Sequence, residues 1–197
     1  MDKEFKVGDV IAFGGFTPVS ELIKFWTRSA VSHVAVVTGF IGGSPLIGES
    51  TSLSGFSGVV ENFLFERLNK YAGNVWRLPL DRSLAPFNES KFRGFLDANI
   101  GKPYDKRQAV KSALDLTDSW QGPGYNEEDF EAFFCSELVA GLFQAAGFID
   151  ERVNCSEVTP IDLCRWRIYA GDQEQIKGEG QRIRRFNTAN PLDWALD

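Results

Sequence analysis

Hydrophobic positions along the chain alternate between short β-branched runs and longer runs with helical spacing. This pattern predicts a mixed α and β fold, with the strands concentrated in the first half. Strands are predicted at Val7–Phe13, Ser32–Thr38, Leu46–Ser50, Val59–Phe63, Asn74–Leu80 and Gln181–Phe186. Helices are predicted at Pro18–Trp26, Phe65–Tyr71, Pro86–Ile100, Lys106–Leu116, from about Phe134 to Gly147, and from Thr159 to Leu163.

The second and third predicted strands flank a turn. The residues between them are Gly42-Gly43-Ser44-Pro45, so we expect the two strands to pair antiparallel. Side chains alternate between the two faces of a strand. His33 should therefore share one face with Ala35 and Val37, and Val34 and Val36 should point the other way.

A cysteine stands at the predicted start of the most apolar helix. Cys135 is followed by the apolar residues Leu138, Val139, Leu142 and Phe143, and Gly147 is expected to end the helix. Backbone N–H groups and the helix dipole at such a position favour the reactive thiolate. A cysteine in an apolar helix is, however, more often a small core residue.

The composition indicates one globular domain and disfavours a nucleic-acid partner. The 197 residues are 43% hydrophobic and 24% charged, which fits one globular domain over 1–197 with a core at about 7–165. The net charge of −6 disfavours nucleic acid as a partner. The one basic cluster, Arg182 to Arg185, alternates with apolar residues and is interpreted as part of an edge strand.

The three cysteines and the single histidine show no zinc-binding spacing, so no metal or other cofactor is expected. The first residues lack the apolar core of a signal peptide, and no run is long enough to span a bilayer. We therefore expect a cytoplasmic protein without a membrane span, unless another export route acts on it.

A long acidic segment, 117–130, precedes the cysteine helix. Loops of this length inside a domain are usually functional or disordered. Glu127, Glu128 and Asp129, together with Glu131, would either be solvated or attract a cationic group of a substrate.

Thiol catalysis needs an imidazole beside the sulfur and a third group that orients the imidazole. His33 is the only histidine, and Glu49 on the next strand could accept its other N–H. The backbone N–H of Cys135 could serve as an oxyanion donor, with Tyr104 as a candidate second donor. Each residue also has an ordinary interpretation: a structural histidine, a solvated glutamate at a strand end, and a tyrosine that covers the core.

Six segments occur in an order that resembles a known family. They are Gly8-Asp9-Val10-Ile11, Ser32-His33-Val34-Ala35-Val36-Val37, the Glu49 strand, Gly101-Lys102-Pro103-Tyr104-Asp105, Phe134-Cys135-Ser136-Glu137-Leu138-Val139 and Thr159-Pro160-Ile161-Asp162-Leu163. Together they resemble the circularly permuted papain-fold thiol hydrolases, the YiiX-like group of the NlpC cell-wall peptidase superfamily. The histidine strand precedes the cysteine helix, as in the permuted group.

The resemblance implies a permuted papain-like α+β fold, in which an antiparallel sheet or barrel packs against helices that include the one bearing the nucleophile. It implies a triad of Cys135 as nucleophile, His33 as base and Glu49 as orienting acid. Tyr104 would lie near the site, where substrate or the oxyanion binds. Ser32 is a further candidate for that role, although a hydrogen bond to the backbone is the more common use of such a serine.

The function implied is that of a cysteine peptidase or amidase, which cleaves an amide or peptide bond through an acyl-enzyme. Its partner would be a peptide, amide or acyl small molecule, including cell-wall or peptide-like substrates. Two alternatives stay open at this point: a lipid acyltransferase or thioesterase-like enzyme of the same fold, and a binding module without turnover. The acidic 117–130 insertion and the lack of a signal peptide depart from the family pattern, and both bear on the substrate.

Overall fold

The computed structural model describes residues 4–15, 30–53, 56–103 and 134–195. Strands in this part of the chain are β1 (Val10–Gly15), β2 (His33–Ile41), β3 (Ser44–Leu53), β4 (Phe56–Phe63), β5 (Gly73–Leu78) and β6 (Glu174–Lys177). Helices are α2 (Leu64–Lys70), α3 (Glu89–Asn99), α5 (Cys135–Ala145) and α6 (Pro160–Arg165), with short 3₁₀ turns η1 (Cys155–Glu157) and η2 (Pro191–Trp194).

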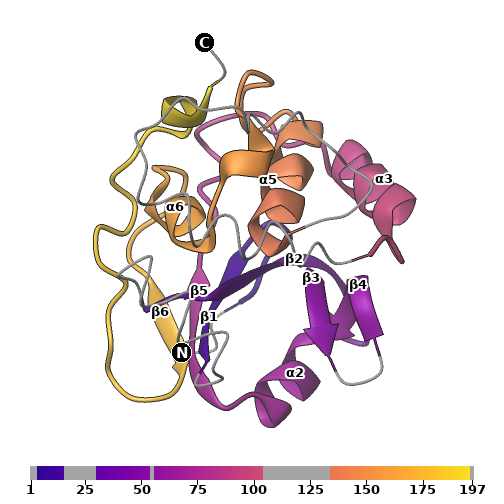
Figure 1. Cartoon of the computed structure of the whole chain (residues 1–197), viewed down its shortest axis with the longest axis vertical. Coiled ribbons are helices and arrows are strands. Elements are labelled where there is room, and N and C mark those ends of the chain that lie inside the picture. Colours follow the sequence, from indigo (N-terminus) through magenta and orange to yellow (C-terminus); the bar gives the residue numbers. More distant parts are fainter. Residues whose placement is uncertain (1–3, 16–29, 54–55, 104–133, 196–197) are drawn as a thin grey trace, which may run out of the picture.

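The strands form one sheet of six strands in the order β4-β3-β2-β1-β5-β6, in which all the neighbours pair antiparallel (Figure 1). The turn between β2 and β3 consists of Gly42 and Gly43, both with positive φ (57° and 80°). Such angles match the twist of a two-residue hairpin and are readily adopted by glycine. The α+β class and the antiparallel sheet are thus confirmed.

Each face of the sheet is covered by a different helix, as Figure 1 shows. Val34 and Val36 pack in the larger core, together with residues of α5 such as Leu138. Ala35 and Val37 pack in a smaller core on the opposite face, which Leu64 of α2 closes. The predicted alternation of β2 is therefore correct.

One predicted strand is wrong. Residues 181–186 form no strand, and the edge of the sheet is β6 at Glu174–Lys177. The side-chain amide of Gln173 takes the place of a neighbouring strand: its Nε2 donates to the Ile183 carbonyl at 3.0 Å, and its Oε1 accepts from the Ile183 N–H. Arg185 then adopts a φ of +58°, which ends the extended backbone.

Other boundaries shift slightly. α3 starts at Glu89 rather than near Pro86, because Asn88 caps it by accepting a hydrogen bond from the Lys91 N–H at 3.0 Å. The predicted Pro18–Trp26 and Lys106–Leu116 helices and the acidic 117–130 segment lie outside the described residues. Across residues 4–15, 30–53, 56–103 and 134–195, no helix has the length and apolar character needed to cross a membrane.

Candidate catalytic site

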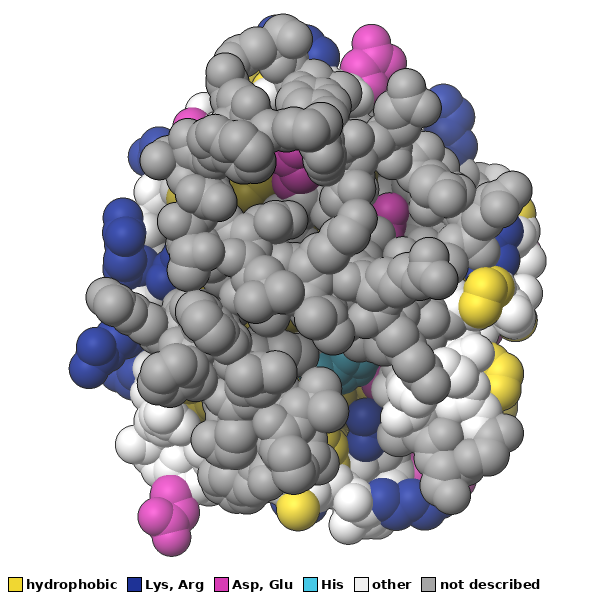
Figure 2. All heavy atoms as spheres, viewed as in Figure 1, with side chains coloured by type: hydrophobic (Ala, Val, Ile, Leu, Met, Phe, Trp, Pro, Cys, Tyr) yellow, Lys and Arg dark blue, Asp and Glu magenta, His cyan; other side chains and the backbone are white. Residues whose placement is uncertain are grey.

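His33 is the first residue of β2, opposite Phe13 of β1. Its ring contacts the Phe13 ring, with 5.4 Å between centroids. The side chain is 15% exposed, so the imidazole lies at the border between core and surface. Figure 2 views this face of the molecule, where the only histidine of the chain, in cyan, reaches the surface.

Glu49 lies in the middle of β3 and its side chain has no exposed surface. Its Oε2 lies 2.7 Å from Nε2 of His33, and its Oε1 accepts a hydrogen bond from Nδ2 of Asn62 at 2.8 Å. The pairing register explains the contact with Asn62. Glu49 is opposite Val60 of β4 and Asn62 is opposite Ile47, so the two polar side chains share one face as diagonal neighbours.

A second charged group reaches the same carboxylate from α2. Nε of Arg67 donates to Oε1 at 3.0 Å and to Oε2 at 3.4 Å. Burial alone would raise the pKa of Glu49, but the His33, Arg67 and Asn62 contacts outweigh it and lower the pKa to about 2. Glu49 is therefore a carboxylate throughout the neutral range.

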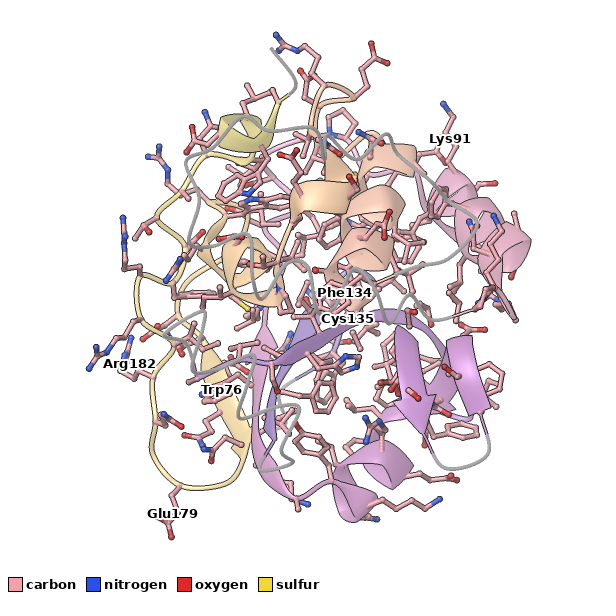
Figure 3. The ribbon with its side chains drawn as sticks, viewed as in Figure 1. Trp76, Lys91, Phe134, Cys135, Glu179 and Arg182 are labelled. Atoms are coloured by element: carbon pink, nitrogen blue, oxygen red, sulfur yellow. The ribbon has the colours of Figure 1, made fainter. Side chains whose placement is uncertain are left out.

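Cys135 is the first residue of α5, and its side chain is buried. Glu137, at the third helical position, reaches back and accepts a hydrogen bond from the Phe134 N–H at 3.1 Å. The hydroxyl of Ser136 donates to the Val158 carbonyl. Figure 3 shows Phe134 and Cys135 at the end of α5 that approaches the sheet. The start of this helix is thus fixed on both sides of the cysteine.

The structure brings Cys135 and His33 together, although they come from opposite faces of the sheet. Burial lowers the pKa of His33, but Coulombic and hydrogen-bond interactions with Cys135, together with those of Glu49, outweigh it and raise the pKa to about 9. Because Nε2 of the imidazole is used by Glu49, the other ring nitrogen, Nδ1, is the one available to the sulfur. The result is a continuous line of thiol, imidazole and carboxylate, which can activate a nucleophile.

The other two predicted site residues differ in status. Ser32 is buried and its hydroxyl is directed at β1, 3.4 Å from the Phe13 carbonyl, and it accepts from the Gly15 N–H at 3.4 Å. A side-chain hydrogen bond with Ser32 also acts on Tyr71, although burial is the larger effect and raises the pKa of Tyr71 to about 12. Tyr104 lies outside the described residues, and its role stays a prediction.

Three residues around the site were missed by sequence reasoning: Asn62, Arg67 and Tyr71. Asn62 could have been found from the strand pairing, because it lies on the Glu49 face of β4. Arg67 and Tyr71 carry no comparable signal, since their positions depend on how α2 docks on the sheet.

Comparisons with known proteins bear on the fold. No protein-family profile matches the chain, and no curated protein matches it in sequence. Among solved structures, the chain is similar to the crystal structure of metalloprotein YiiX from Escherichia coli O157:H7. The TM-score is 0.52 at 20% sequence identity, and the match covers 73% of this chain and 67% of that chain. This similarity concerns the fold alone.

The described residues contain no group of three or more His, Cys, Asp or Glu side chains arranged to hold a metal ion.

Proposed function

We propose that this chain is a cysteine-dependent hydrolase of the permuted papain-like type that cleaves an amide or peptide bond through an acyl-enzyme. Cys135 would be the nucleophile, His33 the base and acid, and Glu49 the group that orients the imidazole. One observation carries the proposal: a fully buried glutamate 2.7 Å from an imidazole that also contacts a cysteine at a helix N-terminus. The similarity to YiiX supports only the α+β fold on which this proposal rests.

In the first half of the reaction, the Cys135 thiolate attacks the carbonyl carbon and a C–S bond forms. The carbonyl oxygen becomes an oxyanion, for which the backbone N–H of Cys135 is a suitable donor. The protonated imidazole of His33 then gives its proton to the amine nitrogen, and the C–N bond breaks. Glu49 keeps the ring in the orientation that allows this transfer, since it accepts from Nε2.

In the second half, His33 is neutral and takes a proton from a water molecule that attacks the thioester. The C–O bond forms, the C–S bond breaks, and the carboxylic acid leaves. The sulfur and the imidazole return to their starting protonation states. No oxidant, reductant or co-reactant other than water is needed.

Selective alkylation tests the nucleophile. We expect iodoacetamide at neutral pH to modify Cys135 faster than a free thiol, as mapped by peptide mass spectrometry. Cys135→Ala should remove this labelling, and His33→Ala should slow it at least about 100-fold, because the imidazole is the activating base. Cys155→Ala is the matched control and should leave the rate unchanged, since Cys155 is a buried thiol that hydrogen-bonds the Val153 carbonyl. If iodoacetamide modifies Cys155 or Cys164 before Cys135, the assignment of Cys135 as the nucleophile is wrong.

The class of substrate that acylates Cys135 distinguishes the competing functions. We expect a mass adduct on Cys135 when the protein is incubated with activated peptide esters, followed by release of the free acid in water. An adduct only from phospholipid or another lipid ester would instead identify the acyltransferase or thioesterase alternative. Tight ligand binding with an unreactive Cys135 would identify a binding module.

A further inference from the structure

The carboxylate of Glu49 is surrounded by more charge than the triad needs. Its Oε2 contacts His33 and its Oε1 contacts Asn62, while Nε of Arg67 lies within 3.4 Å of both oxygens. The Glu49 side chain has no exposed surface, and that of Arg67 is 12% exposed. A buried carboxylate requires a compensating charge, or it takes up a proton.

His33 can supply that charge for only part of the reaction. Whenever the imidazole has given its Nδ1 proton to a leaving group, its Nε2–H still donates to Glu49, but the ring is neutral and no longer supplies a positive charge. A guanidinium stays protonated at every pH at which the protein is folded. Arg67 therefore provides the positive charge at the stage when His33 does not.

The guanidinium is also fixed in place. It lies over two aromatic rings, 5.4 Å from the centroid of Phe13 and 5.3 Å from that of Tyr71. These two rings contact each other edge to face at 4.9 Å, and the Phe13 ring also touches His33. One aromatic side chain, Phe13, thus contacts both the base and the arginine, and its ring favours a guanidinium at this position beside Glu49.

We propose that Arg67 is a positioning residue of the Cys135 site, which keeps Glu49 ionised through the reaction from the face of the sheet opposite to α5. This proposal deepens the function proposed above. Among the described residues, the charged and titratable groups that face Glu49 are His33 from β2, Arg67 from α2 and Tyr71 after it, with Cys135 of α5 acting through His33. Only Arg67 carries a permanent charge among these four.

The single histidine provides a direct readout. The imidazole resonances of His33 can be assigned without ambiguity, and their acid-side inflection reports protonation of the Glu49 carboxylate in contact with Nε2. We expect Arg67→Met to raise this inflection by one to three pH units relative to the wild type, because removal of a positive charge at hydrogen-bond distance favours the neutral acid. In Arg67→Lys, which keeps the positive charge, the inflection should lie within half a pH unit of the wild-type value.

Arg93→Met is the matched control. Arg93 of α3 forms an ion pair with Glu61 of β4 at 2.6 Å, and by strand alternation Glu61 points to the face of the sheet opposite to that of Glu49 and Asn62. Its loss should not move the His33 inflection. An unchanged inflection in Arg67→Met would overturn the proposal and leave Arg67 with only a role in docking α2.

The rate of Cys135 alkylation separates this inference from the proposed function. If the inflection moves as expected but Cys135 of the wild type is unreactive, the electrostatic role of Arg67 stands and the hydrolase proposal fails. If both hold, Arg67→Met in a Glu49→Gln background should add no further change to the pH profile of alkylation, because no charge remains to be held. Additive effects in that double variant would overturn the positioning role. If Arg67→Met does not fold, Arg67→Gln supplies the same comparison.

Discussion

The three cysteines of the chain are buried to nearly the same degree, yet their surroundings differ. Cys164 lies in the apolar core, where burial raises its pKa well above the ordinary range of a thiol. The Cys155 thiol donates to the Val153 carbonyl, 3.8 Å away. Cys135 lies beside an imidazole at the first turn of a helix. The neighbours, rather than exposure, make Cys135 the candidate nucleophile.

The pKa values of His33 and Glu49 predict how stability depends on pH. The folded-state pKa of His33, about 9, is above its ordinary value of 6.5, so its contribution is complete below pH 6.5 and is lost as pH rises through 9. Glu49 has a lowered pKa of about 2 against an ordinary 4.5, so its contribution is complete above pH 4.5 and is lost as pH falls through 2. Both contributions are therefore complete between pH 4.5 and 6.5.

We expect the His33 contribution to the free energy of unfolding to be lost as pH rises from 6.5 through 9, which adds a falling slope in this range. Urea denaturation at several pH values in this range would measure it. His33→Gln should remove most of this slope, and Cys135→Ala should reduce it, since the thiolate is one of the charges that hold the imidazolium. A slope that is the same in all three proteins would contradict the assigned contacts.

At the scale of elements, sequence patterns predicted the parts whose structure is set by local chemistry. The β2–β3 hairpin follows from two glycines between β-branched runs, and the α6 start from Thr159 before Pro160. β6 could not be predicted, because Glu-Gln-Ile-Lys has no apolar alternation, whereas the alternating residues 181–186 are not a strand. Its pairing with β5 is decided by contacts about 100 residues apart in sequence.

The site shows the same division. Cys135, His33 and Glu49 were expected together from residue type, from the single imidazole and from the family resemblance, and their catalytic role stays a prediction. Arg67 could not be predicted, because nothing in the pattern of α2 indicates that its fourth residue reaches a buried carboxylate 18 residues earlier. A contact between a helix and the face of the sheet that it covers can be read only from the assembled fold.

The start of α5 offers a prediction at this scale. The Ser136 hydroxyl, fully buried, donates to the Val158 carbonyl and so ties the cysteine helix to the segment between η1 and α6. We expect Ser136→Ala to lower the free energy of unfolding by about 1–3 kcal/mol, because it leaves a buried carbonyl without this donor. Thr188→Ala is the control: it removes an exposed hydroxyl that bonds the Arg185 carbonyl, and should have a much smaller effect in the same urea titration. Equal effects would show that the Ser136 contact adds nothing.

At the scale of the whole molecule, one buried ion pair connects parts of the chain that are far apart in sequence. Nε of Arg77 on β5 donates to Oδ2 of Asp9 at 2.7 Å, and its other nitrogens reach Glu174 on β6 and the Glu4 carbonyl. Asp9 belongs to the Gly-Asp-Val-Ile segment on which the resemblance partly rests, and it also accepts from the Leu80 N–H at 3.1 Å. Asp9 therefore has a structural role in that segment. Its carboxylate, directly before β1, binds Arg77 of β5, and Arg77 in turn contacts Glu174 of β6.

This ion pair should dominate global stability without acting on the cysteine chemistry. Both side chains are buried. We expect Arg77→Met, which leaves Asp9 without this ion pair, to cost about 3–5 kcal/mol, and Asp9→Asn, which leaves Arg77 with Glu174 as an acidic partner, to cost no more than that. Asparagine keeps an acceptor for the Leu80 N–H, so Asp9→Asn isolates the loss of charge.

In the double variant of Asp9 and Arg77 neither of the two charges is left unpaired. Its cost should be smaller than the sum of the single costs by about 0.5–3 kcal/mol. Arg182→Met, which breaks an exposed pair with Asp172, is the control and should change the urea midpoint little. Strictly additive single costs would mean that Asp9 and Arg77 stabilise the sheet independently, through their backbone contacts rather than through each other.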